Sequence, residues 1–204
     1  MRKLMTLDDL YTFFSEQSTS TNFSVDMKHY AIAVSVPGRI SYDTSDTSKL
    51  GLTPVVLNAC HTGKNLNQSR ISKEAMEEAL PSFNDRPILG YIWIDENGNP
   101  QFDSHNMHQT EDGELKYDEK PIGHIRENSD SHLEYDEEKD VYRVIVDGYI
   151  YDDYTEAVDI LEREKQLDVS VELAVLDLSY SAEEKVLDIN KFIFTGVTIL
   201  GKDE

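Results

Sequence analysis

The sequence predicts an α+β domain, or a β-barrel with helices around it, from three observations. About seven or eight segments are rich in β-branched and aromatic residues, as strands are, and three segments carry apolar residues at helical spacing. These segments do not follow a regular strand–helix alternation, which argues against a doubly wound parallel sheet. The chain has 204 residues, 39% of them hydrophobic, which suits one domain with a substantial core.

Each expected element rests on a local signal. Thr6 can cap the first helix, whereas Ser72 caps the second and Pro81 ends it. Apolar and polar residues alternate over 139–151, which is typical of a half-buried strand. We expect helices over 6–17, 72–80 and 153–166, and strands over 30–43, 52–63, 86–95, 139–151, 167–176, 185–189 and 192–201.

The remaining stretches set the domain organisation. Residues 101–140 are polar and acidic apart from an apolar island at 120–125, so we expect a long functional or disordered loop there. Residues 1–25 are expected to form an N-terminal arm or short helix with a linker, and residues 26–204 a single β-rich domain. A helix packed on the domain is the favoured form of the arm, and a docking segment or removable peptide is the alternative.

The charge of the chain excludes several classes of partner. Lys and Arg number 19 against 40 Asp and Glu, a net charge of -21, so we expect neither nucleic acid nor anionic membrane to bind. The sequence has no apolar run of membrane-spanning length. Cys60 is the only cysteine, which rules out an internal disulfide and is compatible with a reducing compartment.

The segment over 167–176 places a serine between two carboxylates. Its odd positions are all apolar and predict a core face, so Asp168, Ser170 and Glu172 share the opposite face. The simpler interpretation is that this face meets water. However, alternate residues of a strand lie about 6.6–6.8 Å apart, which a histidine accepting from a hydroxyl and donating to a carboxylate can span. A Ser-His-acid device is therefore geometrically feasible here.

Candidate bases for such a device are the six histidines, which are His29, His61, His105, His108, His124 and His132. His105 and His108 lie in "FDSHNMHQT", in the long polar segment where functional loops tend to lie. A metal site built from these two and His124, with Asp103 and Glu111, is one alternative, but the spacing is not that of a zincin helix. A nucleophilic Cys60 is another, although a buried cysteine is the favoured interpretation. We expect no metal and no cofactor.

Five short motifs occur in an order that resembles the tailed-phage prohead proteases, capsid-maturation serine peptidases similar in fold to herpesvirus assemblin. The motifs are "RPILGYI" (86–92), "SHNMH" (104–108), "KPIGHI" (120–125), "DVSVELAV" (168–175) and "FTGVTILG" (194–201), and the resemblance covers about residues 52–201. By resemblance, the family histidine falls on His105 and the family serine on Ser170, while His108 is a neighbour.

The resemblance has consequences for fold and activity. It implies a mostly antiparallel seven-stranded β-barrel surrounded by helices. It also implies a serine endopeptidase with His105 as general base, Ser170 as nucleophile and backbone amides around the oxyanion. The expected substrates are phage scaffold and major capsid proteins and the protease itself, inside the assembling procapsid in the host cytoplasm. A homodimer stays open, because assembly-linked peptidases can need a partner to order their site.

This sequence departs from the family pattern at the third catalytic position. The position where many members carry an acid just before the last strand motif is Gly196. Glu172, on the same strand face as Ser170, is our first choice to orient or charge-stabilise His105, and Asp168 is the second; neither comes from the family pattern. The alternative function is a catalytically inactive, acidic capsid assembly or scaffold factor of the same fold.

Overall fold

Strands dominate the structure, a computed structural model that describes residues 12, 21–23, 32–34, 39–45, 50–65, 67–111 and 115–201. The helix predicted over residues 6–17 lies outside the described residues, apart from Thr12. The described α-helices are α2 (Lys73–Ala79) and α3 (Ala157–Glu164), and one 3-10 helix, η2 (Leu80–Phe83), follows α2. Neither described helix has the length and hydropathy needed to cross a membrane.

The described strands fall into one large sheet and two small hairpins. The large sheet holds β1 (Thr21–Phe23), β2 (Ile32–Val34), β3 (Arg39–Tyr42), β4 (Leu52–His61), β5 (Gly63–Lys64), β6 (Ser69–Ile71), β7 (Pro87–Gly90), β12 (Lys120–Ile125), β13 (His132–Asp136), β14 (Val141–Tyr151), β15 (Val169–Ser181) and β16 (Val186–Ile199). The hairpins are β8 (Ile92–Ile94) with β9 (Pro100–Phe102), and β10 (Met107–Gln109) with β11 (Leu115–Tyr117).

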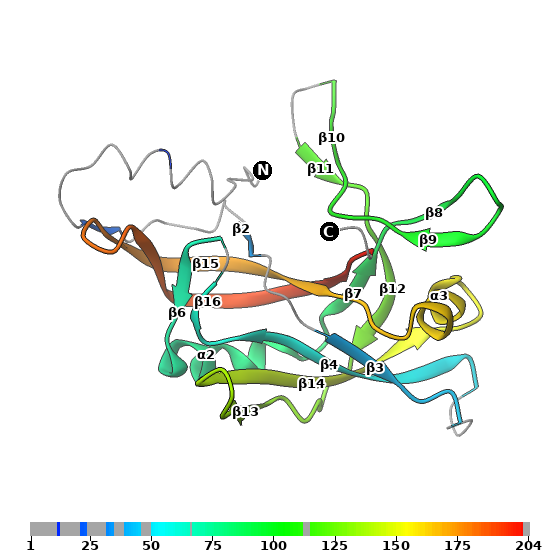
Figure 1. The fold of residues 1–204 in the computed structure, drawn as a ribbon, viewed down its shortest axis with the longest axis horizontal. Coiled ribbons are helices and arrows are strands. Elements are labelled where there is room, and N and C mark those ends of the chain that lie inside the picture. Colours follow the sequence, from blue (N-terminus) through cyan, green and yellow to red (C-terminus); the bar gives the residue numbers. More distant parts are fainter. Residues whose placement is uncertain are drawn as a thin grey trace.

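The large sheet is a curled, mixed half-barrel (Figure 1). Its main path runs β1-β15-β16-β7-β12-β14-β4-β3, and β16 lies parallel to both β6 and β7. The expected fold class, an α+β domain built on a seven-stranded, mostly antiparallel barrel surrounded by helices, is therefore wrong. The two described α-helices are too short to surround a barrel, and the main path ends in β1 and β3 instead of closing. Register shifts in the β15–β16 pair mark irregularities of the kind that bend long strands.

The core matches the alternation of the sequence in β15. Leu167, Val169, Val171, Leu173 and Val175 are all buried, which confirms the predicted core face. Below β16, Phe83 of η2 stacks on Phe194 with ring centroids 3.6 Å apart. Aromatic stacking of this kind adds to the free energy gained from burying the two rings. This contact packs η2 against β16.

The helix over 72–80 begins and ends where its signals predicted. The Ser72 side chain accepts a hydrogen bond from the Ala75 amide at 3.1 Å, as an N-cap does. Pro81 then lies in η2, because a proline cannot supply the amide that continues an α-helix. The third predicted helix is shorter than expected and spans Ala157–Glu164.

The polar segment after residue 100 is the part that the sequence predicted least well. It contains β9 to β13, so the expectation of one long loop, functional or disordered, is wrong. The predicted strand over 86–95 is divided at Tyr91, with β7 in the large sheet and β8 in a separate hairpin. Short polar strands in hairpins lack the apolar alternation by which strands are recognised.

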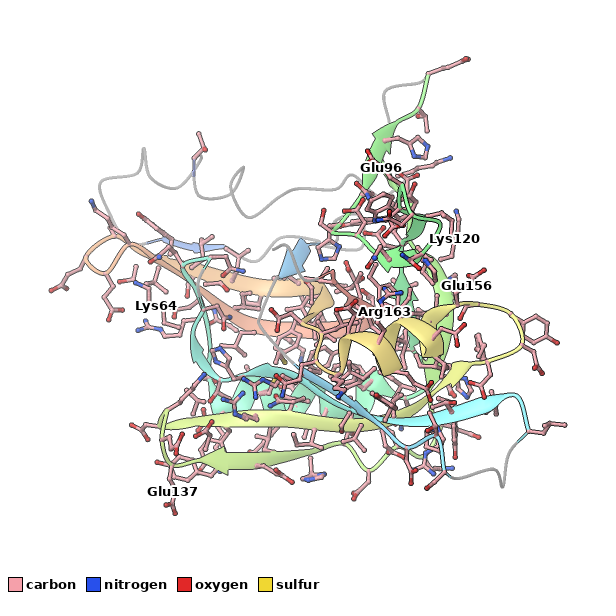
Figure 2. The ribbon with its side chains drawn as sticks, turned by 45° about the vertical axis from the view of Figure 1, so that its right-hand side comes forward. Lys64, Glu96, Lys120, Glu137, Glu156 and Arg163 are labelled. Atoms are coloured by element: carbon pink, nitrogen blue, oxygen red, sulfur yellow. The ribbon has the colours of Figure 1, made fainter. Side chains whose placement is uncertain are left out.

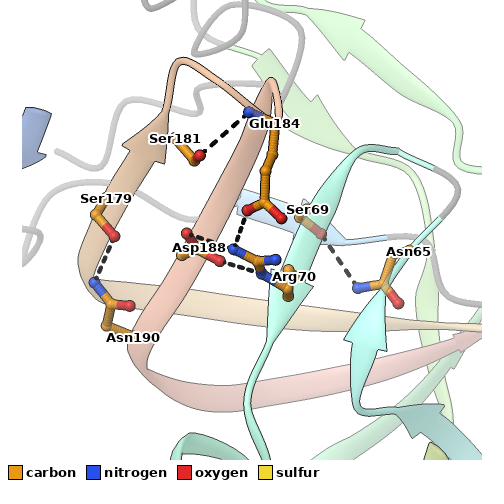
Figure 3. Close-up of polar contacts among 8 residues, drawn as sticks. All are labelled: Asn65, Ser69, Arg70, Ser179, Ser181, Glu184, Asp188 and Asn190. Atoms are coloured by element: carbon orange, nitrogen blue, oxygen red, sulfur yellow. Dashed lines mark hydrogen bonds and ion pairs between the residues drawn. The ribbon is translucent and has the colours of Figure 1, made fainter. Parts of the chain in front are cut away.

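Charged side chains join neighbouring elements at the surface. Arg70 on β6 donates through Nε to Asp188 on β16 at 2.6 Å and through Nη2 to Glu184 at 2.7 Å (Figure 3). Arg163 of α3 (Figure 2) donates through Nη2 to the Pro100 carbonyl at 2.6 Å and to Gln101 Oε1 at 2.9 Å. This second contact holds the β8–β9 hairpin against α3, next to the segment that carries His105.

Candidate active site

His105 lies in the connection between β9 and β10, which Asp103 organises. The Asp103 carboxylate accepts the Ser104 amide at 2.8 Å and the Asn106 side-chain amide at 2.8 Å. The Gly201 amide donates to the Asp103 carbonyl at 3.3 Å, which ties the connection to the end of β16. A Cβ at Gly201 would come within 2.3 Å of the Phe102 carbonyl oxygen, so only glycine permits this approach. The His105 side chain is held over the large sheet.

Two carboxylates face the Nδ1 atom of His105. Glu119, between β11 and β12, places Oε1 at 3.1 Å, and Glu172 of β15 places Oε1 at 3.8 Å. Only the first distance is a hydrogen bond. A carboxylate oxygen accepts, so Nδ1 carries the proton and donates it to Glu119. In the neutral imidazole, the lone pair therefore lies on Nε2, which is buried and has no hydrogen-bond partner in the structure.

Glu172 is held by the neighbouring strand. Its Oε1 accepts a hydrogen bond of 2.9 Å from the buried Thr198 hydroxyl of β16. In the β15–β16 register, Ser170 lies opposite Thr198, and Glu172 lies opposite Gly196. Many members of the resembled family carry an acid at the position of Gly196. In this chain, Glu172 lies directly opposite that position on the neighbouring strand.

Burial shifts the pKa of two groups in this cluster, Glu172 and Tyr117. Burial is the largest effect on Glu172 and raises its pKa. The His105 charge and the Thr198 hydrogen bond lower the pKa of Glu172, whereas the nearby Glu119 charge raises it further. The Tyr117 ring packs edge-on at 6.3 Å from the His105 ring. Burial, followed by the charges of Glu172 and Glu119, raises the pKa of the Tyr117 phenol, so it stays a neutral hydroxyl.

Ser170 lies on the same strand face as Glu172 but is completely buried. The simpler interpretation, in which this face meets water, is therefore wrong for Ser170. Asp168, the second-choice acid, is exposed. Since His105 Nε2 is unbonded, it makes no hydrogen bond with the Ser170 hydroxyl in this arrangement.

The other candidates separate from this cluster. His108 on β10 donates through Nδ1 to Asp118 at 2.6 Å, and the His124 ring lies 5.8 Å from the Tyr149 ring and 5.6 Å from the Tyr151 ring. The described residues bring no three potential ligands together in an arrangement that could hold a metal ion. The structure thus does not assemble the alternative metal site from His105, His108 and His124.

The remaining nucleophile and base candidates lie elsewhere. Cys60 is buried next to Met76, and burial raises the pKa of its thiol, as expected of a structural cysteine. His61 Nδ1 donates to the Thr62 carbonyl at 2.8 Å, and His132 lies on β13 with Glu134. His29 lies outside the described residues.

A cavity of about 410 Å³ opens beside the His105 connection. It reaches from the β8–β9 hairpin to the start of β15, and its lining includes Trp93, Asp95, Asp103, Ser104 and Leu167. Ser104 directly precedes His105 and Leu167 lies three residues before Ser170 in the chain. This cavity therefore offers space for part of a ligand beside the segment that carries His105.

Three residues of the cluster were missed by sequence reasoning, namely Tyr117, Glu119 and Thr198. Glu119 is one of 40 acidic residues and lies in an acidic stretch, so nothing in the pattern distinguishes it. Its one signal is its place directly before "KPIGHI", one of the motifs of the resemblance. Thr198 could have been found from the pairing of the two long strands, because it lies opposite Ser170.

Comparison with protein families gives a match for this chain. The model of the YonD N-terminal domain family matches residues 50–204. The chain belongs to this family. It is a phage-type protein family, so the bacteriophage context of the resemblance holds at this coarse level. Comparison with curated proteins and with solved structures found no match.

Proposed function

We propose that the chain is a phage capsid-maturation serine endopeptidase with His105 as general base and Ser170 as nucleophile. Its substrates are scaffold and capsid segments and the protease itself, within the procapsid in the host cytoplasm. The observation that supports this most directly is the state of His105. Its Nδ1 donates to Glu119 while its Nε2 keeps an unshared lone pair, over the strand that carries Ser170.

The proposed reaction follows from these positions. The Ser170 oxygen attacks the peptide carbonyl while His105 Nε2 takes the hydroxyl proton, and the same nitrogen then returns the proton to the leaving amine. His105 then takes a proton from water, which attacks the acyl carbonyl; the bond to the Ser170 oxygen breaks, and His105 returns the proton to that oxygen. Glu119 holds the tautomer and stabilises the imidazolium, the role that the sequence pattern predicts for Glu172. Glu172, fixed by Thr198, is the second carboxylate facing the ring.

Catalysis in this proposal requires a local opening. Ser170 is fully buried, so a substrate carbonyl reaches it only after a neighbouring segment moves. Peptidases that act inside an assembling particle profit from such closure, because it prevents hydrolysis before assembly. The site as described is then a resting form of the enzyme.

The test is co-expression of the chain with the phage scaffold and major capsid proteins. Wild type should yield shortened scaffold or capsid products, whereas Ser170→Ala should leave them intact. Ser179→Ala is the matched control, because Ser179 lies on the same strand with Asn190 as its partner and away from His105. Identical products from wild type and Ser170→Ala would exclude Ser170 as the nucleophile.

A second candidate function is a protein of the same fold that does not catalyse peptide hydrolysis. The complete burial of Ser170 and the missing bond to His105 favour a non-catalytic assembly factor that binds capsid or scaffold proteins. In that case wild type and Ser170→Ala would support particle assembly equally, with no shortened product in either. The co-expression experiment therefore separates the two functions.

A further inference from the structure

The strand that carries Ser170 has two edges, which are occupied differently. Along one edge, β15 pairs with β16 over most of its length. In the described chain, the other edge is paired by two three-residue strands, β1 at Leu178–Tyr180 and β2 at Val171–Leu173. The edge next to Ser170 is thus filled by a short piece of the chain's own N-terminal segment, as Figure 1 shows for β2 beside β15.

The register brings this pairing directly up to the nucleophile. Val34 lies opposite Val171 and Ala33 lies opposite Glu172, in antiparallel orientation. A peptide that continued this register by one residue would place its next residue opposite Ser170. Directly opposed residues in antiparallel strands lie about 4.5–5.5 Å apart between Cα atoms. An extended peptide on this edge would therefore bring a backbone carbonyl close to the Ser170 hydroxyl.

The occupant is separate from the family domain. The family match begins at residue 50, so β1 and β2 both come from the preceding segment. A three-residue strand makes few backbone hydrogen bonds, so its release costs far less than removing a strand of the core. Ile32, Ala33 and Val34 are the small and β-branched residues typical of strands that add to a sheet edge.

From these observations we propose that the edge of β15 at Val171–Leu173 is the docking edge for an extended peptide substrate. β2 is its resident occupant, and the departure of β2 frees the edge beside Ser170. This inference rests on the proposed peptidase function for its catalytic consequence. The preferred partner is an extended segment of small and β-branched residues, bound mainly through its backbone.

The test compares full-length variants that weaken β2 pairing. Ala33→Pro and Val34→Pro remove neighbouring amides, and because successive amides of a strand point to opposite sides, one of them faces β15. Ala33→Val, which keeps the amide, is the matched control. The probe is a fluorescent synthetic peptide with the sequence of residues 28–36, KHYAIAVSV.

We expect one proline variant to bind this peptide at least about tenfold more tightly than wild type or Ala33→Val, because the edge is vacated. Hydrogen exchange should accelerate at residues 171–173 and stay unchanged at β4 and β14, which verifies that the fold persists. Unchanged exchange at 171–173 together with unchanged peptide affinity in both proline variants would overturn the inference.

A fluorophosphonate probe separates this inference from the proposed function. Faster labelling of Ser170 in the proline variant, with none in its Ser170→Ala derivative, supports both. Tighter peptide binding without any labelling of Ser170 keeps the docking edge and rejects the peptidase. Equal labelling rates in wild type and both proline variants, with unchanged peptide affinity, would support the proposed peptidase function. They would contradict the proposal that β2 blocks the docking edge.

Discussion

The Nδ1 atom of His105 lies 3.1 Å from Glu119 Oε1, and the Glu119 side chain is only 1% exposed. The two residues come from different connections that flank the β10–β11 hairpin. The β10–β11 hairpin therefore brings the Glu119 carboxylate next to the His105 imidazole. Replacing Glu119 should therefore change the protonation of the His105 ring nitrogens more than the stability of the fold.

Glu119→Gln should lower the rate of Ser170 labelling or substrate cleavage by about 10²–10⁴-fold, because an amide no longer fixes the Nδ1-protonated tautomer. A purely structural role would leave that tautomer unchanged. Nitrogen NMR of the imidazole therefore provides the second readout, in which we expect protonation to shift toward Nε2. A variant with wild-type rate and an unchanged His105 spectrum would contradict the positioning role of Glu119.

His105 and His108 should behave differently despite their spacing of three residues. His105→Ala should abolish cleavage, because it removes the proposed general base. His108→Ala should leave the rate within about twofold of wild type, since its pair with Asp118 is exposed and such pairs contribute little. The rates are measured in the co-expression assay. If His108→Ala were the inactive variant, our assignment of the base would be wrong.

The raised pKa of Glu172 predicts how folding stability depends on pH. Between the ordinary glutamate pKa and the raised folded-state value, the folded chain binds more protons than the unfolded chain, so the contribution of Glu172 to stability falls as pH rises. His105, Glu119 and Tyr117 face this carboxyl. Glu172→Gln cannot ionise and should gain stability relative to wild type as pH rises through that window. Urea denaturation between pH 4 and 8 measures the difference, and a constant difference would refute the prediction.

The Phe83–Phe194 stack should be among the more costly contacts to remove. Phe83→Ala should lower the free energy of unfolding by about 3–5 kcal/mol, because it leaves a cavity under β16. Tyr154→Ala, at a side chain 86% exposed, should change it by less than about 0.5 kcal/mol. Urea midpoints at constant pH compare the two variants. Equal losses of unfolding free energy in the two variants would mean that the Phe83–Phe194 stack does not contribute more to stability than an exposed side chain.

Much of the strand pattern could be predicted from local sequence. The alternation over 139–151 and 167–176 identified β14, β15 and the core face of β15 because burial on one side imposes a period of two. The Ser72 cap located α2 for an equally local reason. By contrast, the hairpins after residue 100 carry polar side chains on short strands, and no apolar period marks them.

The candidate site could be predicted only in part. Ser170 and Glu172 were paired by their two-residue spacing, and His105 was singled out by resemblance. Glu119 and Thr198 were not found, because they reach His105 and Glu172 through contacts between elements that are distant in the chain. The predicted barrel was wrong because strand number and closure depend on long-range pairing, here the parallel neighbours of β16.

The sequence by itself determined the local properties of this protein, namely its acidic surface, its apolar strand faces and the shared face of Ser170 and Glu172. These properties follow from composition and period, which each segment carries alone. Only the tertiary structure decided which acid meets His105, that Ser170 is buried, and that β2 fills the edge beside it. Those features depend on strand register and on the return of remote segments, which local propensity does not encode.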